Sequence, residues 1–161
     1  MSECCKSGYK WHGQPVGKES TISGKKTYVN GSNDDVAISL VADIFGWTLT
    51  NATVLADHFA KDLNATVYVP DFFDGEVISP EMLEDPEKAK SFTIMVWFGR
   101  HNKAKRGPEI IAVTEELHSK YEKVGVLGFC YGGWAVFQLA GRDKNLVDCI
   151  STAHRSALDR A

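Results

Sequence analysis

The stretch that decides the fold class is Gly128-Phe129-Cys130-Tyr131-Gly132-Gly133. It follows a buried strand expected at residues 124–128 and opens a helix expected at 131–139. This context is typical of a nucleophile elbow, whose pattern is glycine, any residue, nucleophile, any residue, glycine. Side chains two residues before and after the nucleophile would collide with the neighbouring strand and helix. We therefore expect Cys130 to lie in a strained turn.

The chemistry of Cys130 follows from its expected place at the start of a helix. Free N–H groups and the positive end of the helix dipole would lower the pKa of the thiol and favour the thiolate. The amide of Tyr131 would be one donor of an oxyanion hole. The alternative is a buried structural cysteine between two core elements, as isolated cysteines usually are.

The pattern upstream of the elbow predicts a parallel sheet. Residues 36–41 form a nearly continuous apolar run, which is typical of a strand buried on both faces. Residues 54, 55, 58, 59 and 63 then fall on one helical stripe, and 66–69 form a second strand that Pro70 stops. The order strand, helix, strand predicts a right-handed unit with parallel strands. A further core strand is expected at 146–150.

Other segments give weaker signals. Thr21-Ile22 and residues 27–29 flank Ser23-Gly24, which predicts a hairpin at a sheet edge. Residues 71–90 are acidic and contain two prolines, so we expect a loop and a short helix there. Residues 99–107 are polar and basic and favour a surface loop, with a satisfied or solvated His101 and a helix beginning at Pro108.

The segment after the first expected core strand is Ala42-Asp43-Ile44-Phe45-Gly46-Trp47. In folds that carry a nucleophile elbow, the loop at this place supplies the second oxyanion N–H. By position Ile44 is the candidate donor, and Asp43 could approach the cysteine. The alternative is an ordinary turn with a capping acid, which this segment taken alone favours.

Three motifs together carry a resemblance to a known family. The elbow at 128–133, Asp43-Ile44-Phe45-Gly46 and Val69-Pro70-Asp71-Phe72-Phe73 resemble the dienelactone hydrolase family, and residues 4–8 and 43–47 resemble its fungal branch. The resemblance covers residues 4 to about 154 and is fairly specific, since most α/β-hydrolases carry serine in the elbow. It implies an α/β-hydrolase fold with a mostly parallel sheet flanked by helices.

The resemblance also implies roles for particular residues. The family acts on esters or lactones through a Cys/Asp/His triad, so Cys130 would be the nucleophile. The amides of Ile44 and Tyr131 would form the oxyanion hole, and Asp43 stands where the family places an acidic neighbour of the resting cysteine. Asp71 matches the motif without an assignable role.

The rest of the triad is not evident in the sequence. The order in this fold is nucleophile, acid, histidine, each after a later strand, and residues 131–161 offer no room for two further strands with their crossovers. His154 ends the fourth expected core strand and could act as base only if it lay within about 3 Å of Cys130. The family's histidine at this point is outside its triad, and Arg155 follows where proline is common. We therefore expect a C-terminally truncated domain that lacks the last strands, with weak or no turnover.

This organisation predicts three segments and two candidate functions. The segments are an N-terminal extension with the edge hairpin at 1–35, the truncated α/β-hydrolase domain at 36–154 and a tail at 155–161. The first candidate function is hydrolysis of small lactones or esters. The second is a non-catalytic module that binds a small molecule or a protein in the same cleft. An open sheet edge in either case predicts self-association.

Composition excludes several classes of protein. Hydrophobic residues make up 43% and charged residues 24%, as in ordinary globular proteins, and the net charge is −3. Scattered Lys and Arg residues exclude a nucleic-acid partner, and the short apolar runs exclude a membrane span. No signal peptide is evident, so we expect a cytoplasmic location and four cysteine thiols rather than a disulfide framework. We expect neither a metal nor a cofactor, because ligand spacings and phosphate-loop patterns are absent.

Overall fold

The computed structural model describes residues 10–85, 87–88, 93–141 and 146–154. Its centre is a six-stranded sheet in the order β1-β2-β4-β3-β5-β6. The parallel strands are β3 (Val36–Val41), β4 (Thr66–Pro70), β5 (Lys123–Phe129) and β6 (Cys149–Ala153). The hairpin of β1 (Lys18–Ile22) and β2 (Lys25–Asn30) adds antiparallel to β4 and places β1 at one edge. The expected edge hairpin and mostly parallel sheet are therefore confirmed.

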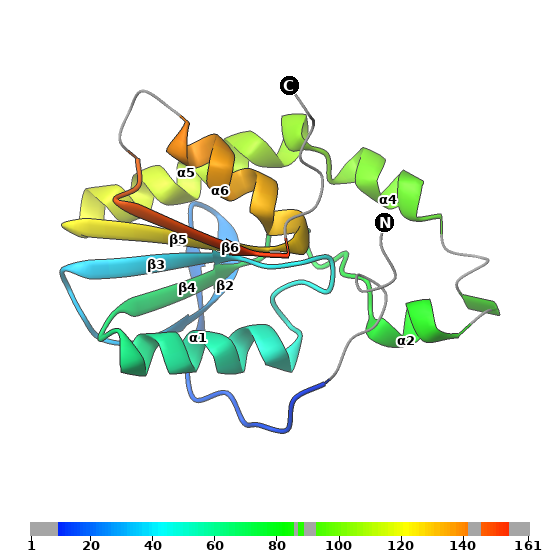
Figure 1. The fold of residues 1–161 in the computed structure, drawn as a ribbon, viewed down its shortest axis with the longest axis horizontal. Helices are drawn as coiled ribbons and strands as arrows, with labels where there is room; N and C mark the ends of the chain where they lie inside the picture. The colour runs from blue at the N-terminus through cyan, green and yellow to red at the C-terminus, as the bar shows by residue number, and fades with distance from the viewer. Residues whose placement is uncertain (1–9, 86, 89–92, 142–145, 155–161) are drawn as a thin grey trace.

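Helices cover both faces of the sheet (Figure 1). Helix α1 (Thr50–Asp62) lies on one face, and α5 (Lys103–Lys120) and α6 (Gly133–Ala140) lie on the other. The short helices α2 (Pro80–Glu84) and α4 (Ile94–Arg100) lie beyond the ends of the strands, on the right in Figure 1. The central strands β3, β4 and β5 are buried along most of their length, because both faces pack against helices.

Two expectations on element boundaries are wrong. Residues 99–107 are not a surface loop, because α4 extends to Arg100 and α5 begins at Lys103, where the Asn102 side chain accepts the Lys105 amide at 3.0 Å. The last strand covers Cys149–Ala153 rather than 146–150. Leu146 is apolar because it packs into the core from the loop before the strand, with 7% of its surface exposed. The tail at 155–161 lies outside the described residues.

The connection from β5 to α6 is the tightest part of the fold. Cys130 has φ +47° and begins a 3-10 turn, Cys130–Gly132, that leads directly into α6. A Cβ at Gly132 would lie 2.2 Å from the backbone oxygen of Val41 on β3, and one at Gly128 would lie 2.4 Å from the oxygen of Gly132. Only glycine fits at these two positions, because backbone atoms close the space that a methyl group needs.

We predict that Gly132→Ala lowers the free energy of unfolding by about 2–3 kcal/mol, because the turn or β3 must move to admit the methyl group. The matched control is Gly99→Ala, at an exposed helical glycine whose added Cβ would meet no atom within 4 Å. That control should raise the free energy of unfolding by up to about 1 kcal/mol. Urea denaturation of both variants measures the difference. Equal midpoints would contradict the steric account.

Candidate active site

The expected strand, turn and helix around Cys130 are all present. Cys130 is 8% exposed and adopts a left-handed backbone conformation that costs a non-glycine residue about 1–3 kcal/mol. Tyr131 follows in the first turn of a helical segment, where N–H groups have no partner within the helix. The thiol and the Tyr131 amide thus lie at the start of the helical segment that becomes α6, as the elbow motif predicts.

The loop after β3 lies beside this turn. Strands β3 and β5 are adjacent and parallel, and their register pairs Val41 with Gly128. Residues 42–47 and Cys130 therefore leave the sheet at the same edge. Ile44 is 1% exposed, and its carbonyl accepts the amide of Ile78 at 3.1 Å, which ties this loop to residues 71–79.

Asp43 caps its own turn. Its carboxylate accepts the Phe45 amide at 2.9 Å, and its carbonyl accepts the Gly46 amide at 3.0 Å. Burial raises the pKa of Asp43 to about 6, against the opposing effect of hydrogen bonds from the Phe45 and Gly46 amides. The capping acid considered from the sequence is thus present, and it is also a carboxyl group with a strongly perturbed pKa at the edge that holds Cys130.

His154 also lies at this edge of the sheet. It directly follows β6, whose Ala153 pairs with Phe129 in β5, and it has φ +54° with an exposed side chain. Asp148 lies at the opposite end, where its carboxylate accepts the Val124 amide at 2.8 Å. The fold therefore brings Cys130, Ile44 and His154 to one edge and keeps Asp148 away from them.

Asp71 acquires a structural role. Its side chain is 5% exposed and accepts the amides of Phe73 at 3.0 Å and Gly75 at 2.7 Å. These two hydrogen bonds shape the loop after β4, which packs beside the loop that carries Ile44. The motif residue that had no assigned role is thus a carboxylate that holds a turn.

A buried polar group that sequence reasoning missed lies next to the elbow. His101 is 1% exposed, and its backbone carbonyl accepts the Tyr131 hydroxyl at 2.5 Å. Its ring packs on Trp97 with centroids 4.5 Å apart. Burial lowers the pKa of His101, with a further lowering by the charge of Arg106 and an opposing effect of Glu76. The four-residue spacing of Trp97 and His101 was the available signal, because it places both on one side of a helical turn.

The same group contains a buried arginine. Arg106 is 1% exposed, and its Nη1 donates to Asp74 at 2.8 Å and to Glu109 at 2.7 Å. Lys25 of β2 contacts the same two carboxylates at 2.7 and 3.0 Å. The guanidinium is thus compensated by charge and closed to solvent, so it belongs to the framework rather than to a substrate site.

Comparisons with known proteins agree with this architecture. The family model described as "Dienelactone hydrolase family" matches residues 26–159. A protein named carboxymethylenebutenolidase homolog from Mus musculus is 36% identical over 139 residues, which cover 84% of this chain and 54% of that protein. Hydrolase pyvD from Aspergillus violaceofuscus is 30% identical over 137 residues, covering 82% and 53%. The chain therefore spans about half the length of these curated relatives.

Solved structures share the fold. A dienelactone hydrolase-like promiscuous phosphotriesterase from metagenomic libraries superposes with a TM-score of 0.64 at 20% identity, covering 91% of this chain and 62% of that one. A dienelactone hydrolase from Anabaena variabilis gives 0.55 at 15% identity, covering 86% and 62%. Because the family model matches most of the sequence, and the sheet and its elbow turn have the expected form, the chain belongs to the dienelactone hydrolase family.

Proposed function

We propose that this chain attacks small carboxylic esters or lactones with the thiolate of Cys130. The observation that carries the proposal is the left-handed Cys130 between β5 and a helical turn, beside the loop of Ile44. Strain at a residue that the surrounding backbone holds in place is characteristic of a functional turn. Membership of the family and the hydrolase names of its relatives support the same reaction class.

The reaction begins with attack of the thiolate sulfur on the carbonyl carbon. A C–S bond forms, and the π electrons of the carbonyl move onto its oxygen. The amides of Ile44 and Tyr131 are the donors proposed for this oxyanion. When the adduct collapses, the C–O bond to the alcohol breaks, and the alcohol leaves with a proton taken from solvent. The product is a thioester on Cys130.

Release of the acid requires a second attack, by water that a base has deprotonated. His154 directly follows the neighbouring strand β6, at the same edge of the sheet as Cys130, but its side chain is exposed. We therefore propose that the 161-residue chain forms the thioester readily and hydrolyses it slowly. A chain that forms no thioester would instead fit the alternative, a non-catalytic binding module.

A reducing location fits this chemistry, because a thiolate nucleophile must stay unoxidised. Cys149, on β6, is an exposed free cysteine. The helices that the structure describes include none long and apolar enough to cross a membrane. We propose the cytoplasm as the compartment, because its reducing conditions would keep the Cys130 nucleophile unoxidised.

We predict a burst of about one p-nitrophenolate per chain from p-nitrophenyl acetate, followed by a slow steady phase, because acylation outpaces hydrolysis. Cys130→Ala should abolish the burst, and Cys149→Ala, which removes the exposed thiol of β6, should retain it. Stopped-flow absorbance measures both phases, and intact mass detects the acetyl group. A burst of unchanged size in Cys130→Ala would remove the nucleophile assignment.

We predict that Asp43→Asn raises stability at pH 8 by about 1–3 kcal/mol and leaves it unchanged near pH 4. The folded pKa of about 6 lies above the ordinary 3.8, so the folded chain binds more protons between these values. Stability of the wild type therefore falls as pH rises through this window, and asparagine removes that loss. Urea titrations from pH 4 to 8 measure it, with exposed Asp62→Asn as the control. Parallel pH curves for wild type and Asp43→Asn would contradict the burial of this carboxyl.

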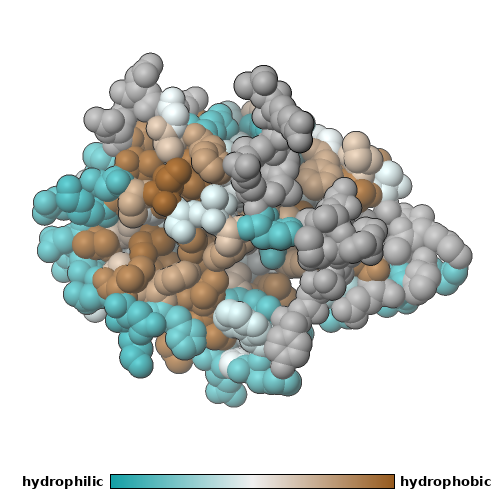
Figure 2. All heavy atoms as spheres, viewed as in Figure 1, coloured by the Kyte–Doolittle hydropathy of each residue, from teal (hydrophilic) through white to brown (hydrophobic). Residues whose placement is uncertain are grey.

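We also propose that the chain self-associates through β6. Among the described strands β6 pairs only with β5, so no described strand covers its outer edge. Figure 2 shows hydrophobic residues gathered over the strands on the viewed side. Ile150 of β6 is itself only partly buried. A second copy offers the same edge, so two β6 strands can pair about a two-fold axis.

We predict a concentration-dependent dimer in sedimentation velocity, and Ser151→Lys should shift it to monomer. Ser151 is exposed on β6, and a lysine on an edge strand opposes pairing by its charge and hydration. The control is Ser119→Lys, which adds the same charge at an exposed position on α5. A monomeric wild type at all concentrations would contradict self-association.

A further inference from the structure

We propose that the hydrogen bond from the Tyr131 hydroxyl to the His101 carbonyl positions the Tyr131 amide as an oxyanion donor. Tyr131 is thus a positioning residue as well as the source of a backbone N–H. This inference rests on the proposed function, since it concerns the geometry of the same site. His101 and its buried partners take no direct part in the proposed acyl transfer. The inference gives them the role of holding Tyr131 in place.

Tyr131 is fixed at two separate points. Its hydroxyl donates to the His101 carbonyl at 2.5 Å, and its side chain is almost fully buried. Its ring meets the edges or faces of Phe73, Trp97 and Trp134 with centroids 5.1, 5.8 and 5.7 Å apart. Burial raises the pKa of Tyr131 above its ordinary value, so the hydroxyl keeps its proton and remains a donor. With both the ring and its tip held, rotation of the Tyr131 backbone away from the elbow is restricted.

The acceptor is itself immobilised. His101 is the C-cap residue that follows α4, and its amide donates to the Trp97 carbonyl at 2.9 Å. Its Nδ1 accepts Arg106 Nη2 at 2.9 Å, and because arginine only donates, the ring proton is on Nε2, which donates to Glu76 at 2.9 Å. A neutral ring therefore bridges a guanidinium and a carboxylate, which fixes the position of the carbonyl that Tyr131 contacts.

The ion pairs extend this support to three parts of the fold. Lys25 comes from the edge hairpin, Asp74 from the loop after β4, and Arg106 and Glu109 from α5. The two cations and the two carboxylates balance in charge, so the buried guanidinium has its compensation within contact distance. The carbonyl of His101 is thus connected to the framework rather than to a free loop.

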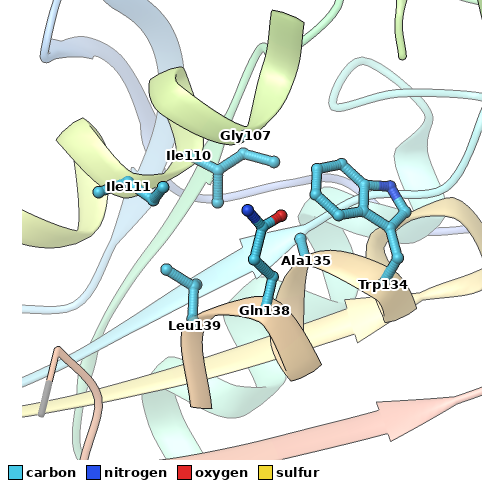
Figure 3. A pocket seen from close by; sticks show the side chains of 7 residues that line it. All are labelled: Gly107, Ile110, Ile111, Trp134, Ala135, Gln138 and Leu139. Atoms are coloured by element: carbon cyan, nitrogen blue, oxygen red, sulfur yellow. The ribbon is translucent and has the colours of Figure 1, made fainter. Parts of the chain in front are cut away.

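The helix that follows Tyr131 has its own separate contact with α5. Figure 3 shows Trp134 and Gln138 of α6 beside Gly107 of α5, where the two helices face each other. A Cβ at Gly107 would lie 3.4 Å from Nε2 of Gln138, so the two helices pack closely. Removing the Tyr131 hydroxyl therefore leaves α6 docked and loosens the turn in front of it.

The test compares two reactions of the same sulfur. Acylation by p-nitrophenyl acetate passes through an oxyanion, whereas alkylation by iodoacetamide displaces iodide at a saturated carbon and forms none. Tyr131→Phe should slow acylation about 10- to 100-fold, a part of what loss of a whole oxyanion donor costs. It should change alkylation less than twofold. Acylation is followed by the nitrophenolate burst corrected with Cys130→Ala, and alkylation by mass spectrometry of the tryptic peptide 124–142, which contains Cys130 alone.

The matched control is Tyr68→Phe. It removes another tyrosine hydroxyl, one that pairs with the Tyr121 hydroxyl at 2.7 Å and comes from the middle of β4. It should lower stability to a similar extent and leave acylation unchanged. Acylation of Tyr131→Phe at the wild-type rate would overturn the inference and leave the proposed function intact. Equal slowing of acylation and alkylation would also overturn it, since the sulfur itself would then be disturbed. A wild type that is alkylated but never acylated would overturn the proposed function, and the inference with it.

Discussion

The close approach of the elbow to β3 determines the geometry of this edge of the sheet. The backbone at Gly132 lies so near the Val41 carbonyl that no side chain fits between them. This contact obliges the chain to turn sharply at Cys130 and to accept a left-handed residue there. Because β3 and β5 are parallel neighbours, the same contact brings the loop of Ile44 to the side of the turn. One steric fact thus sets the place of the thiol, of the helix start behind it and of the second candidate donor.

Burial of the groups around His101 is the second condition of this arrangement. A guanidinium and an imidazole that are each 1% exposed are stable only when their hydrogen bonds are made and the charge is balanced. Arg106 meets both demands through Asp74 and Glu109, and His101 meets them by staying neutral between Arg106 and Glu76. Burial makes a protonated His101 costly, and the charge of Arg106 adds to that cost against the opposing effect of Glu76, so the pKa of His101 is lowered. The region is therefore rigid for electrostatic as well as for packing reasons.

Features set by local interactions could be predicted from the sequence, whereas features set by contacts between distant residues could not. The elbow and the apolar strands could be predicted, because glycine spacing and hydrophobic runs are local signals. Residues 99–107 could not, since their polar composition resembles that of a loop until Asp74 and Glu109 are known to compensate Arg106. The predicted bounds of β6 were wrong for a related reason. Leu146 is apolar because the core needs it, and its apolar character says nothing about whether its backbone pairs with β5.

A cysteine in place of serine at the elbow affects which steps of ester cleavage this edge of the sheet could support. A serine in this place stays protonated near neutral pH and needs a base before it can attack, whereas a thiol at a helix start supplies thiolate without a partner. The edge formed by β3, β5 and the turn therefore holds what the proposed bond formation to an acyl group demands: the thiol of Cys130 and the two backbone amides proposed as donors for the oxyanion. Hydrolysis of the resulting thioester demands a different group, a base that can hold a water molecule over it. The two steps need different groups from the fold. A cysteine elbow can therefore form a thioester even where it hydrolyses that thioester slowly.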